Sequence, residues 1–131
     1  RTADEYAVWL IDLMALEGLE REAITDSIIS SVVPEGNFNL TTLCNRYFKC
    51  DPLFIGQDHC DLGIEALIDR PDQVGADRLV NTVAVHGKYE GALIVIDFGT
   101  ATTFDVVDED GNYRGGVICP GINLSLGVLR V

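Results

Sequence analysis

The sequence predicts an α/β fold, because segments with helical spacing of apolar residues alternate with short runs rich in β-branched residues. A second observation is the run of four aliphatic residues at 93–96, which we expect to form a strand buried on both faces. The third is size: the chain has 131 residues, 47% of them hydrophobic, which is enough to build the core of one domain.

The N-terminal segment predicts a helix that begins near Thr2. Thr2 and Glu5 have the spacing of a capping box, and Gly18 is a natural helix end. The apolar side chains between them recur at helical spacing and are expected to face the core. These residues are Tyr6, Trp9, Leu10, Leu13, Met14 and Leu16.

The next segment is expected to alternate strand and helix. β-branched residues predict a strand over Ser27–Val33, ended by Pro34. Helical spacing returns over residues 40–48, and a short strand is expected over residues 53–55. Residues 56–73 form an irregular connection.

A helix is expected to open at residue 74 and to end at Gly87, with Leu79, Val80, Val83 and Ala84 on its packing side. Asp77 and Arg78 then lie in its first turn. The helix dipole favours an acid there, so Asp77 has a structural explanation, whereas Arg78 gains nothing from that field. Two interpretations of Arg78 remain open: its guanidinium binds a carboxylate ligand, or it pairs with a neighbouring acid.

The strand at residues 93–96 runs into Asp97, and Gly99 and Thr100 follow. A carboxylate beside a turn of small polar residues can hold a cation while the turn offers N–H groups to a phosphate. The same residues are equally typical of a tight hairpin turn.

Residues 103–107 are expected to form a partner strand, which a turn at 108–111 joins to a returning strand at 112–118. Gly115 and Gly116 in the returning strand allow a close approach by a ligand or by a neighbouring element. A new helix is expected over residues 122–129.

The charge balance excludes some partners. With 9 Lys and Arg against 21 Asp and Glu, the net charge is -12, which repels nucleic acid and anionic membrane surfaces. A polyanion such as a nucleotide therefore needs a local group of donors and a cation. We find no apolar run long enough for a membrane span and no signal sequence, so the prediction is a cytoplasmic protein.

The four cysteines, Cys44, Cys50, Cys60 and Cys119, lack the spacing of a zinc site. A site that combines His59 with Cys60 is disfavoured, because adjacent residues seldom reach one tetrahedral ion. We expect free thiols in a reducing compartment. The sequence opens without Met and stops just after an apparent helix start, which indicates a fragment.

Three segments, Gly75–Arg78, Asp97–Thr102 and Gly115–Gly121, resemble the type III pantothenate kinases in their order and separation. Each segment alone is weak evidence for this family, but the three segments in this order are specific for it. The resemblance implies the ribonuclease-H-like, actin-like ATPase fold. Residues 1–90 would then be the end of the first domain, and residues 91–131 the start of the second.

The resemblance further implies ATP-dependent phosphorylation of pantothenate, the first step of coenzyme A synthesis. In that family pattern Gly75, Ala76, Asp77 and Arg78 contact pantothenate, and Asp77 accepts the proton of its primary hydroxyl. Asp97 binds a monovalent cation, potassium or ammonium. Gly99 and Thr100 contact the ATP phosphates. A divalent cation, magnesium, and a homodimer are also implied.

The sequence departs from the family pattern at its ends. The family's N-terminal phosphate loop and the second half of its C-terminal domain, with the adenine site, are absent from these residues. We therefore expect the isolated 131 residues to be inactive. Two alternatives stay open: a non-catalytic homologue that binds nucleotide or a pantothenate-like ligand as a regulator, and another small-molecule kinase or ATPase of the same superfamily.

Overall fold

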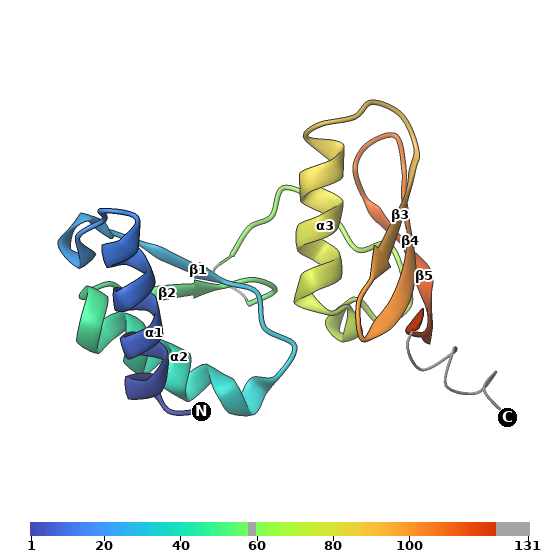
Figure 1. Cartoon of the computed structure of the whole chain (residues 1–131). Helices are drawn as coiled ribbons and strands as arrows, with labels where there is room; N and C mark the ends of the chain where they lie inside the picture. The colour runs from blue at the N-terminus through green and yellow to red at the C-terminus, as the bar shows by residue number, and fades with distance from the viewer. Residues whose placement is uncertain (58–59, 123–131) are drawn as a thin grey trace, which may run out of the picture. The chain divides into compact units, whose positions relative to one another are not determined.

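The computed structural model describes residues 1–57 and 60–122 and divides the chain into two compact units, Arg1–Cys60 and Asp61–Val131 (Figure 1). Both units combine helices with strands, so the predicted α/β class is confirmed. The ribonuclease-H-like assignment and a domain boundary between residues 90 and 91 stay predictions. No helix among the described residues has the length and apolarity needed to cross a membrane.

The first unit contains two α-helices and a two-stranded parallel sheet. The elements are α1 (Ala3–Leu16), β1 (Ser27–Ile29), α2 (Asn37–Leu43) and β2 (Pro52–Phe54). A π-helical turn, Cys44–Phe48, continues α2, so the helix predicted over residues 40–48 is confirmed. Ser27 lies opposite Pro52 in the sheet.

The predicted capping box at the start of α1 is confirmed. The Thr2 hydroxyl accepts a hydrogen bond from the Glu5 backbone N–H at 3.3 Å, and the Thr2 N–H donates to the Glu5 carboxylate at 2.7 Å. Gly18, two residues beyond the helix, adopts a φ of 70°, which glycine reaches without a Cβ penalty. The helix therefore begins and ends where the sequence predicts.

The expected packing face of α1 is largely wrong. The buried cluster on which α1 packs consists of Ala3, Ala7 and Leu43, with Tyr6 and Ile11 packed against it. The larger side chains predicted to face the core are exposed instead: Trp9, Leu10, Leu13 and Leu16. Alanine side chains bring α1 close to α2, so the contact falls on the alanine side of the helix.

The first strand is shorter than predicted, because it ends at Ile29 and not at Val33. The Ser31 hydroxyl accepts a hydrogen bond from the Val33 N–H at 3.2 Å and also lies 3.2 Å from the Val33 carbonyl. Such a local side-chain bond competes with sheet pairing and turns the chain before Pro34.

The second unit packs one helix against a three-stranded antiparallel sheet in the order β3-β4-β5 (Figure 1). The elements are α3 (Ala76–His86), β3 (Leu93–Phe98), β4 (Ala101–Val107) and β5 (Tyr113–Pro120). The predicted helix and hairpins are thus confirmed, with boundaries shifted by a few residues. In the second hairpin turn, the Asp108 carboxylate accepts a bond from the Asn112 N–H at 2.8 Å. The helix expected over residues 122–129 lies almost wholly outside the described residues.

Burial of β3 on both faces is wrong for this chain. Leu93 and Val95 are half-buried, whereas Ile94 is 70% exposed and Ile96 is 48% exposed. The half-buried side shares its face with Asp97, which contacts α3. Among the described residues, α3 covers that face and no element covers the opposite one, so the strand alternates in exposure.

The packing side of α3 also differs from the prediction. Ala76 and Thr82 are buried, whereas Val80, Val83 and Ala84 are exposed. The Thr82 hydroxyl donates a hydrogen bond to the Arg78 carbonyl at 2.9 Å, which satisfies this polar group within the helix. Arg78, one turn before Thr82, contacts the buried Asp105 of β4, so the side of α3 toward the sheet includes polar residues.

Candidate active site

The first turn of α3 presents Asp77 to solvent. Gly75 is the N-cap, with an extended backbone (φ −61°, ψ 140°), and its carbonyl accepts the first helical hydrogen bonds, from Arg78 at 3.1 Å and Leu79 at 3.3 Å. The Asp77 carboxylate accepts from the Arg78 N–H at 2.9 Å. Because the Asp77 side chain is exposed, it remains accessible to a substrate.

Asp97, near the end of β3, lies against the same helix. Its carboxylate accepts a hydrogen bond from the side-chain amide of Asn81 at 3.5 Å. Asn81 follows Asp77 by four residues, and residues at this spacing are neighbours on a helix surface. Asp97 therefore contacts the residue of α3 that lies one helical turn beyond Asp77.

Gly99 and Thr100 lie in the turn between β3 and β4, whose last paired residues are Phe98 and Thr102. The Gly99 N–H donates to the Ala101 carbonyl at 2.9 Å, and both turn residues are exposed. Gly121 packs beneath the turn: a Cβ there would lie 2.8 Å from the Gly99 carbonyl oxygen and would clash with that of Thr100. The hairpin geometry is thus observed, and phosphate binding by the turn stays a prediction.

Arg78 turns into the unit and pairs with a buried acid, Asp105 of β4. The Arg78 Nε donates to Asp105 Oδ1 at 2.7 Å, and Nη2 forms an ion pair with the same oxygen. The two side chains are 14% and 1% exposed. Of the two interpretations of Arg78, the structure shows the ion pair with an acid; contact with a substrate carboxylate stays a prediction.

Two hydroxyl groups complete the surroundings of Asp105. Tyr113 donates to Oδ1 at 2.9 Å, and Thr103 donates to Oδ2 at 3.3 Å. The Tyr113 ring lies 5.5 Å from the Arg78 guanidinium carbon. Both oxygens of the carboxylate are therefore hydrogen-bonded, as a buried charge requires.

The electrostatic consequences are clear for two groups. Burial, together with the hydrogen bond to the Asp105 carboxylate, raises the pKa of Tyr113 to about 12. For Arg78, burial lowers the pKa, but the hydrogen bond and the charge of Asp105 outweigh it, so the pKa lies above its ordinary value. Arg78 is thus charged and Tyr113 is neutral across the physiological range.

Gly116 leaves the space in which Arg78 and Asp105 meet. A Cβ at this position would lie 2.6 Å from Asp105 Oδ1 and would clash with Arg78 Nη2 and the Phe104 carbonyl oxygen. The close approach expected here is therefore observed at Gly116, where neighbouring protein atoms make it. At Gly115 a Cβ would meet Ile68 Cγ2 at an ordinary contact distance of 3.5 Å.

Sequence reasoning missed three residues of this site: Asn81, Asp105 and Tyr113. A usable signal existed for Asp105, because an acid between Thr103 and Val107 at an inward strand position needs a cationic partner, and Arg78 was a cation without a partner. Asn81 could have been found from its helical spacing to Asp77. Tyr113 carries no local signal of its role.

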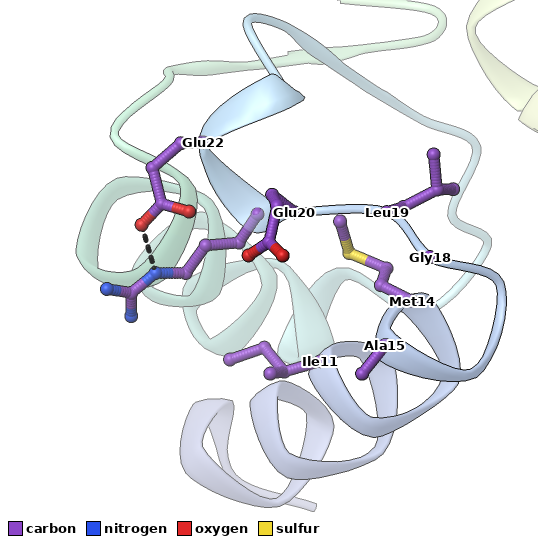
Figure 2. A pocket seen from close by; sticks show the side chains of 8 residues that line it. Ile11, Met14, Ala15, Gly18, Leu19, Glu20 and Glu22 are labelled. Atoms are coloured by element: carbon purple, nitrogen blue, oxygen red, sulfur yellow. Dashed lines mark hydrogen bonds and ion pairs between the residues drawn. The ribbon is translucent and has the colours of Figure 1, made fainter.

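The described residues have two further features, a hollow and free cysteines. A hollow of about 320 Å³ in the first unit is lined by apolar side chains that include Ile11, Met14 and Leu19, and by Glu20 and Glu22 (Figure 2). None of the predicted site residues lines it. The cysteines are free thiols, and residues 1–57 and 60–122 contain no group of three or more metal-binding side chains.

Comparison with known proteins adds a family match and close relatives. A family model described as type III pantothenate kinase matches residues 1–131. A type III pantothenate kinase of Paramagnetospirillum magneticum is 64% identical over the whole chain, which covers 50% of that protein. Those of Rhodospirillum rubrum and Dinoroseobacter shibae are 63% and 59% identical, with 51% and 50% of their lengths covered. The chain spans about half the length of these curated relatives.

Proposed function

The chain belongs to the type III pantothenate kinase family, and we propose on this basis that the full-length protein phosphorylates pantothenate with ATP to give 4'-phosphopantothenate. The observation that carries the proposal is the family match over all 131 residues, at up to 64% identity to relatives of that name. The contact of Asp97 with Asn81, which follows Asp77 by one turn of α3, supports it.

Asp77 is the proposed general base. Phosphoryl transfer passes through a loose transition state, so catalysis depends on positioning and charge neutralisation more than on a strong base. An exposed carboxylate in the first turn of a helix meets this need, because an alcohol can reach it. Gly75, Ala76 and Arg78 are the proposed contacts that hold pantothenate beside it.

Asp97 is the proposed ligand of a monovalent cation, potassium or ammonium, next to the phosphates. A carboxylate about 4 Å from a phosphate oxygen is repelled by roughly 4 kcal/mol per charge pair at an effective dielectric near 20, so a cation between them is required. Gly99 and Thr100, exposed in the adjacent hairpin turn, are the proposed phosphate contacts. ATP brings magnesium as its own counterion.

We also propose a homodimer located in the cytoplasm. The location is supported by the free thiols of the described cysteines, which suit a reducing compartment. The dimer is carried over from the family resemblance. The net charge of -12 argues against nucleic acid or an anionic membrane as a partner.

The test is an assay of the full-length protein with ATP and pantothenate, in which ADP release and phosphopantothenate are both quantified. We expect equal amounts of the two products, and a requirement for potassium or ammonium. A full-length protein that binds both substrates but forms no phosphopantothenate would contradict the proposal. The same assay on the isolated 131 residues is expected to show no turnover.

A further inference from the structure

The ion pair between Arg78 and Asp105 is unusual in its position and in its surroundings. It is buried, yet Arg78 directly follows the exposed Asp77 in the first turn of α3. Replacing a buried ion pair by apolar residues is often neutral or stabilising, so stability alone is a weak reason for one. A role in fixing the direction of Arg78 explains the arrangement better.

The contacts hold one edge of the guanidinium only. Asp105 contacts Nε and Nη2 of Arg78, and within residues 1–57 and 60–122 no other side chain accepts a hydrogen bond from this guanidinium. Nη1 is thus left for another acceptor. A guanidinium held at one edge presents its remaining N–H groups in a defined direction, which suits a planar carboxylate.

Asp105 is itself held firmly enough to serve as an anchor. Tyr113 and Thr103 occupy its two oxygens, and the absence of a side chain at Gly116 leaves the pair its space. Supporting groups of this kind fix the rotamer of a binding residue before the ligand arrives. All of them lie in β4 and β5, whereas Arg78 lies in α3.

We propose that Asp105 is a positioning residue: it orients Arg78 so that the free edge of the guanidinium receives the carboxylate of the substrate. The inference rests on the proposed function, because it takes pantothenate as the ligand. Asp105 does not touch the substrate. It acts through Arg78, and Tyr113 supports it with one hydrogen bond.

The test compares Asp105→Asn, Tyr113→Phe and the control Asp110→Asn in the full-length protein. Asp110 is an exposed acid in the hairpin turn, away from Arg78. Each variant is assayed with pantothenate and with pantothenyl alcohol, which keeps the reacting hydroxyl but lacks the carboxylate. We expect Asp105→Asn to raise the KM for pantothenate by about 10- to 100-fold. The KM values for the alcohol and for ATP should stay within about twofold of wild type.

Tyr113→Phe removes one hydrogen bond to Asp105 and should raise the KM for pantothenate by about two- to tenfold. This second variant tests the proposal even if Asp105→Asn does not fold. Three results would overturn the positioning role. The first is an equal KM change for pantothenate and for pantothenyl alcohol, and the second is a lowered kcat with an unchanged KM. The third is a set of kcat and KM values equal to those of Asp110→Asn. Wild-type protein that forms no phosphopantothenate overturns the proposed function instead, so the two failures are distinguishable.

Discussion

The side-chain amide of Asn81 donates a hydrogen bond to the carboxylate of Asp97, across 3.5 Å. This contact joins α3, which carries Asp77 one turn earlier, to the end of β3. The proposed base and the proposed cation ligand are thereby tied to one polar contact between a helix and a strand. The predictions below concern the full-length protein.

The substitution Asp77→Asn should remove the proposed base and lower kcat by at least about 100-fold. ATP affinity should stay close to wild type, because Asp77 lies on α3 and not in the Gly99–Thr100 turn. Turnover and ATP binding are measured separately, by product formation and by calorimetry. Asp110→Asn serves as a control, and normal turnover by Asp77→Asn would refute the assignment.

The substitution Asp97→Asn should abolish activation by potassium. The amide of asparagine has nearly the same size as the carboxylate and can still form hydrogen bonds. It lacks the negative charge that holds the cation beside phosphate. The measurement is initial rate against potassium concentration at fixed ionic strength, with the large ion tetramethylammonium as replacement. A half-activating potassium concentration equal to that of wild type would show that Asp97 holds no cation.

Two substitutions at Asn81 should separate hydrogen bonding from charge. Asn81→Ala removes a long, exposed bond and should reduce the rate only about two- to fivefold. Asn81→Asp places a second carboxylate beside Asp97, so repulsion should be strong at low potassium and relieved at saturating potassium. Potassium titrations of both variants provide the check. Identical responses of the two variants to potassium would contradict the proposed repulsion between residue 81 and Asp97.

Gly116→Ala should destabilise the protein by about 1–3 kcal/mol, because the added Cβ enters the space where Arg78 meets Asp105. Gly36→Ala is the matched control: its backbone is right-handed (φ −80°) and no atom lies within 4 Å of the added Cβ. The free energy of unfolding is measured by urea denaturation. Equal stability of the two variants would contradict the close approach at residue 116.

Stability should fall in alkaline solution because of Tyr113. Its pKa is raised to about 12 in the folded state, above the ordinary value of 10.0, so the unfolded state releases the proton first as pH rises. The stabilisation is complete below pH 10.0 and is lost as the pH approaches 12, on the order of 2–3 kcal/mol in total. Urea unfolding at pH 8 and at pH 11 should show a smaller loss for Tyr113→Phe than for wild type.

The local elements of this protein could be predicted from short stretches of sequence. Three examples are the capping box of Thr2 and Glu5, the helix that carries Asp77, and the turn at Gly99. Each depends on interactions between residues that are close together in the sequence. The family resemblance needed only the order of three such stretches. It was confirmed by the match over residues 1–131.

The sequence by itself thus determined the elements and the family, while the tertiary structure decided which side chains meet. Arg78 and Asp105 are separated by 27 positions, and their pairing depends on how α3 lies across the sheet. The exposed face of β3 and the alanine contact of α1 were likewise misjudged, because apolar spacing shows that a side chain can be buried but not whether another element covers it. Burial and ion pairing are properties of distant segments brought together, so only the folded chain reveals them.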